Sequence, residues 1–109
     1  MRQIIISDIH GCRNELNQLL DKVGARAEEV IFLGDYVDTG TDSAGVLSTV
    51  MAWVENGAAA LLGNHDELFL EWLAGHEDIF YYGRIGGLAT INSFLAKMGL
   101  NSVGYTELL

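Results

Sequence analysis

Residues 4–11 of the chain read Ile-Ile-Ile-Ser-Asp-Ile-His-Gly. Three β-branched residues directly before polar residues and a glycine are typical of a buried strand that ends in a turn. Apolar residues then recur at helical spacing, at Leu16, Leu19, Leu20 and Val23. Gly24 is placed to end this helix, since glycine readily takes the left-handed conformation after a last helical turn. Residues 4–24 therefore predict a strand, a turn and a helix.

A short apolar run followed by turn residues and a helical pattern occurs twice more. The apolar runs are residues 30–33, before Gly34, and residues 58–62, before Gly63. Apolar side chains at helical spacing follow at positions 46, 47, 50, 51 and 54, at 68, 69, 72 and 73, and at 88, 91, 94, 95 and 98. Strands that alternate with amphipathic helices predict an α/β fold, with a mostly parallel sheet flanked by helices on both faces.

The composition excludes several classes of protein. The 109 residues include 6 Lys+Arg and 15 Asp+Glu, for a formal net charge of −9. A chain this acidic is a poor binder of a phosphate backbone, so we expect no nucleic-acid partner. Half of the residues are hydrophobic and none is proline, which indicates a folded core of at most one domain.

The cellular location is also constrained. No apolar run approaches the ~18 residues of a membrane span, so we expect no membrane partner. The polar Ser7 comes too early for a signal peptide. Cys12 is the single cysteine and can form no internal disulfide, which is typical of a reduced compartment. We therefore expect a cytoplasmic protein.

Potential metal ligands follow each of the three predicted strands. They are Asp8, His10, Asp35, Asn64 and His65. The carboxyl ends of parallel strands meet at one edge of a sheet, which brings these side chains close together. Carboxylate, imidazole and amide donors suit Mn, Fe, Zn or Mg. A single Asp or Asn after a strand is usually a turn residue, but three such sets in succession predict a metal site.

Three motifs give the chain a family resemblance, namely residues 8–11, 34–38 and 63–66. They resemble the first three motifs of the calcineurin-like metallophosphoesterases, and in particular the Ser/Thr protein phosphatases with their bacterial and phage relatives, which include the diadenosine tetraphosphatases. Residues 7–20, 32–47 and 61–70 resemble that family throughout. The segment containing Gly86-Gly87, Thr90, Ser93 and Phe94 is similar to its next part.

The resemblance implies a fold and a domain extent. Residues 1–109 would be the N-terminal half of a four-layer α-β-β-α sandwich, truncated at the C-terminus. One face of their sheet would then need a cover, either the missing half of the domain or a second copy of the chain. The implied substrates are phosphorylated, either a protein or a small phosphoester.

The resemblance also implies two divalent metals, with Mn expected before Fe or Zn. Asp8 and His10 would bind the first metal, and Asp35 would bridge both through its carboxylate. Asn64 would bind the second through its side-chain oxygen. The family completes that second site with two later histidines, which have no counterpart among these 109 residues.

His65 would be the general acid, and Asp38 would orient it. An alkoxide leaving group needs a proton, and imidazole titrates near neutral pH. A carboxylate beside the ring fixes its tautomer. The plainer alternatives are a polar residue at a helix start for His65 and a turn residue for Asp38.

Other polar residues carry less weight as site residues. Thr39 stands where the family usually has an arginine that holds substrate phosphate. Arg13 and Arg84 are candidate phosphate contacts, Arg13 the better placed, although a solvated surface charge is the commoner role. His76 is expected in a surface loop.

Two hypotheses remain open from the sequence. The first is a metal-dependent phosphoesterase, favoured by the pair of His65 and Asp38. The second is a truncated, non-catalytic relative that binds a metal or a phosphorylated ligand, favoured by Thr39 and the incomplete second metal site. A Rossmann-type nucleotide site has little support, because residues 7–11 do not form G-x-G-x-x-G.

Overall fold

The computed structural model describes residues 2–104, so the ends of the expected domain 1–109 lie outside the described part. The helices and strands, with a 3-10 turn η1 and a π-helical turn η2, are β1(Ile4–Ile6), α1(Arg13–Val23), η1(Ala27–Glu29), β2(Val30–Phe32), α2(Ser43–Glu55), β3(Ala59–Ala60), α3(Asn64–Leu73), α4(Ile79–Tyr82), η2(Gly83–Gly87) and α5(Leu88–Lys97). This order confirms the predicted α/β fold.

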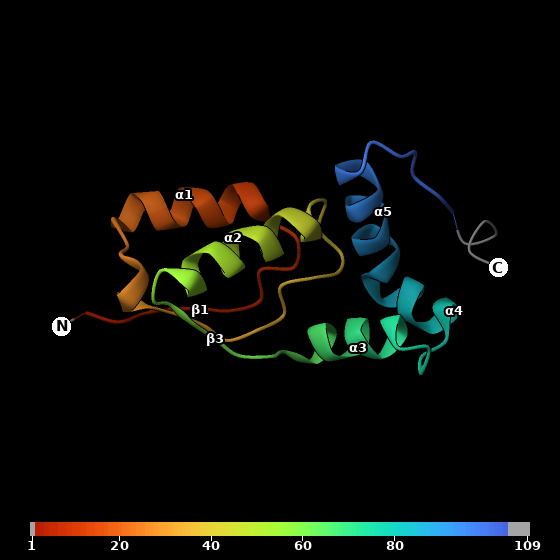
Figure 1. The fold of residues 1–109 in the computed structure, drawn as a ribbon, viewed down its shortest axis with the longest axis horizontal. Helices are drawn as coiled ribbons and strands as arrows, with labels where there is room; N and C mark the ends of the chain where they lie inside the picture. The colour runs from red at the N-terminus through yellow and green to blue at the C-terminus, as the bar shows by residue number, and fades with distance from the viewer. Residues whose placement is uncertain (1, 105–109) are drawn as a thin grey trace.

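The sheet has three parallel strands in the order β1-β2-β3. Helix α1 links β1 to β2, and α2 links β2 to β3. Both connections run between neighbouring strands in the same direction, so right-handed crossovers put both helices on one face (Figure 1). The core lies between that face and the helices and contains Ile6, Leu16, Leu20, Val30, Phe32, Val46 and Val50.

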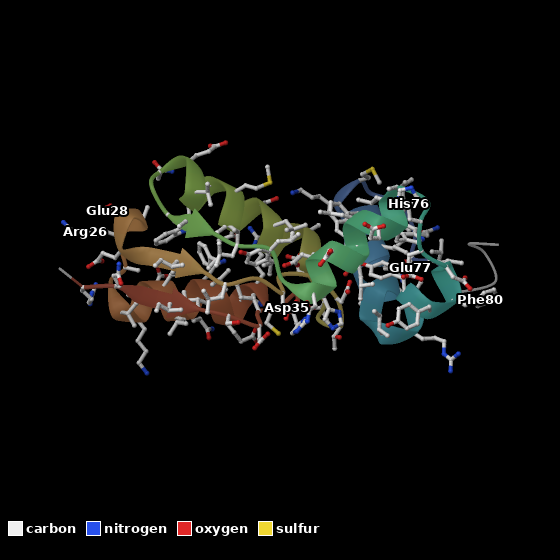
Figure 2. All side chains as sticks on the ribbon, turned by 90° about the horizontal axis from the view of Figure 1, so that it is seen from below. Arg26, Glu28, Asp35, His76, Glu77 and Phe80 are labelled. Atoms are coloured by element: carbon white, nitrogen blue, oxygen red, sulfur yellow. The ribbon has the colours of Figure 1, made fainter. Side chains whose placement is uncertain are left out.

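Within residues 2–104 the opposite face of the sheet is open, which differs from the expected cover on both faces. Ile5, Ile31 and Ala59 are aligned by the strand register and share this face. Ile5 is 60% exposed, and Leu33 and Leu61 beyond the strand ends are 41% and 57% exposed. Figure 2 views the molecule from below, with the sheet in front of α1 and α2.

The end of α1 follows the prediction from the sequence, and the start of α2 is capped by a side chain. Gly24 takes φ 61° after α1, and its N–H bonds back to the last turn. The side chain of Asp42 caps α2 by accepting from the N–H of Gly45. The third strand is shorter than the predicted run of residues 58–62. The N–H of Leu61 still donates to the carbonyl of Phe32 at 2.8 Å, whereas the carbonyl of Leu61 accepts from the hydroxyl of Tyr36 at 2.6 Å.

The second half of the chain is helical and lies beyond the carboxyl ends of the strands (Figure 1). The predicted helical stripe of residues 88–98 corresponds to α5, whereas α4 was not predicted. The two helices meet at η2, where Gly86 takes φ 112°. Tyr82 at the end of α4 is fully buried and stacks on Trp72 of α3, with ring centroids 5.5 Å apart. None of the helices described in residues 2–104 is both long and apolar enough to cross a membrane.

Candidate metal centre

Two turns lie side by side at the carboxyl edge of the sheet. The N–H groups of His10 and Gly11 donate to the carbonyls of Asp35 and Tyr36, each at 2.9 Å. A third turn begins α3 and closes on the second, because the N–H of His65 donates to Asp35 Oδ1 at 2.9 Å. The three motifs that follow the strands therefore meet through direct hydrogen bonds, backbone to backbone between the first two and backbone to side chain between the second and the third.

Backbone strain is concentrated at this edge. Among the described residues, the non-glycine residues with positive φ are Asp8, His10, Asp35, Asp38 and Thr39. Left-handed conformations cost free energy for residues with a Cβ and cluster at functional sites. Gly40 adds a close approach, since a Cβ there would lie 1.9 Å from the carbonyl oxygen of His10. All five strained residues belong to the two adjacent turns.

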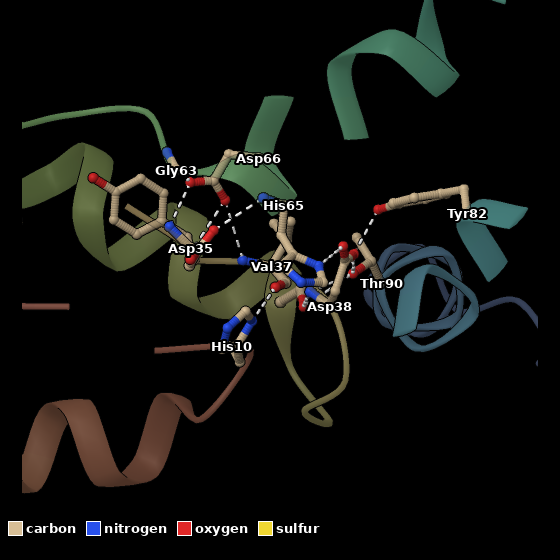
Figure 3. A network of polar contacts seen from close by, with 11 residues as sticks. His10, Asp35, Val37, Asp38, Gly63, His65, Asp66, Tyr82 and Thr90 are labelled. Carbon is tan, nitrogen blue, oxygen red and sulfur yellow. Dashed lines mark hydrogen bonds and ion pairs between the residues drawn. The ribbon is translucent and has the colours of Figure 1, made fainter. Parts of the chain in front are cut away.

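Three side chains form a donor cluster. Asp8, His10 and Asp35 each offer a ligand atom, and these atoms all lie within 4.8 Å of one another. The Nδ1 of His10 lies 2.8 Å from the carbonyl oxygen of Val37 (Figure 3). With its proton on Nδ1, the ring would donate a hydrogen bond to this carbonyl and keep the lone pair of Nε2 for a metal ion. Metal-binding histidines in proteins are commonly oriented in this way. Two carboxylates and one imidazole fit Mn²⁺, Fe²⁺ or Zn²⁺.

A buried carboxylate without an assigned role shapes this cluster. Asp66 accepts from the N–H groups of Asp35, Tyr36 and Gly63 at 2.7, 2.8 and 2.9 Å. It therefore ties the second turn to the third and holds Asp35 in place. One feature of the sequence indicates this role. Asp66 is the third residue of α3, and a carboxylate at that position can accept from the backbone N–H of the residue before the helix.

His65 and Asp38 form an ordered pair beside the donor cluster. His65 Nδ1 lies 2.8 Å from Asp38 Oδ2, and the side chain of His65 is 29% exposed while that of Asp38 is fully buried. The ring of His65 meets that of His10 edge-on, with centroids 4.9 Å apart. With Nδ1 engaged by Asp38, Nε2 is the nitrogen available for proton transfer.

Asp38 has two further partners that sequence reasoning missed. The hydroxyls of Tyr82 and Thr90 donate to Asp38 Oδ1, at 2.6 and 2.7 Å. Burial, with the hydrogen bond to Asp38, raises the pKa of Tyr82. Thr90 belongs to a segment that resembles the family, but no local pattern connects either residue with Asp38. Figure 3 shows this network.

The remaining candidates lie around the cluster. Asn64 is exposed at the first position of α3, next to His65. Arg13 begins α1 and pairs with Asp42 across 3.5 Å, and its side chain is half exposed. Arg84 is exposed on η2. His76 is exposed after α3 and lies 3.2 Å from Glu71, outside the cluster.

A parallel α/β sheet with carboxylate and imidazole donors gathered beyond its strand ends is typical of metal-dependent hydrolases. The comparison with known families specifies the class further. A model of the calcineurin-like phosphoesterases matches residues 1–107, and the chain belongs to that family.

Curated relatives include two kinds of bis(5'-nucleosyl)-tetraphosphatase. The symmetrical enzyme of Erwinia tasmaniensis is 42% identical over 77 residues, which cover 69% of this chain and 28% of that protein. The asymmetrical enzyme PrpE of Oceanobacillus iheyensis is 31% identical over 94 residues, which cover 76% of this chain and 38% of that protein. The matched part of the chain thus spans between a quarter and two-fifths of the length of these relatives.

Proposed function

We propose that this chain supplies the first metal site and the general acid of a metal-dependent phosphoesterase, with Mn²⁺ as the first metal to test and Fe or Zn as alternatives. The observation that carries the proposal is the cluster of Asp8, His10 and Asp35 directly beside the pair of His65 and Asp38. Family membership supports it independently.

Each residue has a proposed task. Asp8 and His10 would hold the first metal, Asp35 would supply its carboxylate to both metals, and Asn64 would contribute to the second. Divalent metals in such sites neutralise phosphate charge and supply an activated water. The backbone N–H of His65 donates to Asp35 Oδ1 and so helps to hold the orientation of this carboxylate.

Proton transfer falls to His65. Its Nε2 donates a proton to the oxygen of the leaving group, while its Nδ1–H stays hydrogen-bonded to the carboxylate of Asp38. Arg13 is proposed as a contact to substrate phosphate, reached when its exposed side chain leaves Asp42. Because Thr39 carries no charge, Arg13 would take the place of the arginine that the family usually has after Asp38.

The names of the relatives suggest dinucleoside tetraphosphates as the first substrate class. Small phosphomonoesters and phosphorylated Ser/Thr proteins are the other classes in the proposal. We keep a cytoplasmic location as part of it, supported by the single cysteine. Residues 1–109 would form the N-terminal part of the catalytic domain. The open sheet face with Ile5 and Leu61 supports a cover by later chain or by a second copy.

The first test is Mn²⁺-dependent hydrolysis of p-nitrophenyl phosphate and diadenosine tetraphosphate. We expect turnover from a chain extended to the length of the relatives and little from residues 1–109 alone, because the second metal has only Asp35 and Asn64 here. Inactivity of the extended chain with Mn, Fe, Zn and Mg would favour the non-catalytic alternative.

Metal content separates the proposed roles. Asp35→Ala should abolish metal binding, whereas His65→Ala should keep the metal and lower turnover by roughly 10²-fold or more, as expected for loss of a general acid. His76→Ala is the matched control, since His76 is an exposed histidine outside the cluster. Loss of metal from the His65 variant would contradict its assignment as the acid.

A further inference from the structure

The carboxylate of Asp38 uses its two oxygens for different tasks. Oδ2 lies 2.8 Å from Nδ1 of His65, and Oδ1 accepts from two hydroxyls that come from much later in the chain. We propose that Tyr82 and Thr90 are positioning residues, whose hydroxyls hold Asp38 in the orientation that aims His65. This inference rests on the role of His65 in the proposed function.

The first argument is the isolation of Asp38. Its side chain is fully buried, and no lysine or arginine is paired with it in the described part of the chain. A buried carboxylate without enough partners costs several kcal/mol. Hydroxyl donors 2.6 and 2.7 Å away are therefore the main partners of Oδ1.

The second argument is that Thr90 holds both the backbone and the side chain of Asp38. Its hydroxyl accepts from the N–H of Asp38 at 2.8 Å and donates to Oδ1 at 2.7 Å. Ser43 Oγ lies 3.1 Å from the same N–H. These bonds hold a residue with φ 78°, a conformation that the chain would not keep without support.

The third argument is that the packing of Tyr82 in the core does not require its hydroxyl group. Tyr82 stacks on Trp72 and on Phe69, with centroids 5.5 and 6.3 Å apart, and a phenylalanine would make the same contacts. The hydroxyl adds nothing to that packing, and a buried hydroxyl must be paired. Its partner is the carboxylate that contacts the proposed acid, so the position is specific for tyrosine because of the site.

The geometry predicts a distinctive defect. With one donor removed, Oδ1 is under-satisfied, the carboxylate turns more freely and the Nδ1–H bond loses its fixed direction. The metal ligands are untouched, so metal binding and substrate binding should persist. What weakens is protonation of the leaving group, and this matters most for leaving groups of high pKa.

The experiment uses Tyr82→Phe and Thr90→Val, with Tyr81→Phe as the matched control, because Tyr81 is exposed beside Tyr82. Thr90→Ser keeps the hydroxyl and should rescue the Thr90→Val defect. The first readout is the imidazole Nδ1–H resonance of His65, in ¹⁵N-histidine-labelled protein without metal. We expect this resonance to shift or broaden in Tyr82→Phe and to stay unchanged in Tyr81→Phe, while backbone amide spectra show that both variants are folded.

The second readout is turnover of a series of aryl phosphates by the Mn²⁺-loaded extended chain. Tyr82→Phe should lower kcat for poor leaving groups about tenfold, part of the roughly 10²–10⁴-fold that general acids contribute, with KM and the rates for good leaving groups nearly unchanged. An equal loss across the series, or a His65 resonance identical to wild type, would overturn the positioning role. If wild type shows no turnover with any metal, the proposed function fails, and the resonance alone decides the inference.

Discussion

Removal of the Asp66 carboxylate should destabilise the protein strongly, because one side chain accepts from four backbone N–H groups. Those of Asp35, Tyr36 and Gly63 lie at 2.7, 2.8 and 2.9 Å, and that of Val37 lies at a longer 3.4 Å. Among the three short bonds, the one from Tyr36 is buried and the other two are partly buried. A buried donor left unsatisfied costs about 1–3 kcal/mol, and a bond to a charged group contributes about 1.5–3 kcal/mol.

Water can reach the two partly buried N–H groups after the substitution, so the free-energy cost of leaving them unpaired is smaller than for the buried N–H group of Tyr36. We therefore expect Asp66→Ala to lower the free energy of unfolding by about 3–5 kcal/mol, a large share of the ~5–15 kcal/mol of a typical domain. Asp66→Asn keeps one acceptor oxygen and should lose about half as much. The assay is urea unfolding followed by tryptophan fluorescence and circular dichroism.

Glu67→Ala is the matched control, since Glu67 is the next residue of α3 and is exposed. Its loss should stay below about 1 kcal/mol, the usual limit of a charge near a helix start. A loss for Asp66→Ala no greater than that of the control would refute the view that this carboxylate ties the second and third turns together.

Three further outcomes follow from local geometry and charge. Gly24→Ala should cost about 1 kcal/mol in urea unfolding, because Gly24 has φ 61° but free space around it. Gly40→Ala should prevent the folding seen by circular dichroism or displace His10, because its Cβ would lie 1.9 Å from the His10 carbonyl oxygen. The hydrogen bonds from Arg2 lower the pKa of Glu29 from 4.5 to about 2. The stability from this pair is therefore present above pH 4.5 and lost as the pH falls towards 2, and urea midpoints of Glu29→Gln should lack that dependence.

The sequence predicts the elements whose structure is determined by residues close together along the chain. Ile4–Ile6 is β1, and Gly24 ends α1 in the expected conformation, because burial pattern and glycine chemistry act over a few residues. The meeting of Asp8, His10 and Asp35 was also predicted, since parallel strands bring their carboxyl ends to one edge.

The contacts of the later helices with the site were not predicted. Tyr82 and Thr90 reach Asp38 across 44 and 52 positions of the chain, and no periodicity encodes that approach. Helix α4 was missed because Ile79–Tyr82 is too short to show a helical period. The sequence predicted helices on both faces of the sheet, but one face is open in the described residues. Which face each helix covers depends on how the strands are connected in space, and the apolar pattern of a single strand does not show this.

The close approach of Gly40 to the carbonyl of His10 limits how this family member can diverge. A side chain at position 40 would push the first and second turns apart, and with them Asp8 and His10 from Asp35. The segment after α3 is less constrained, because Gly75 and His76 are exposed and a Cβ at Gly75 would meet nothing. The chemistry of the site and its choice of substrate can then change independently, by mutation in different segments.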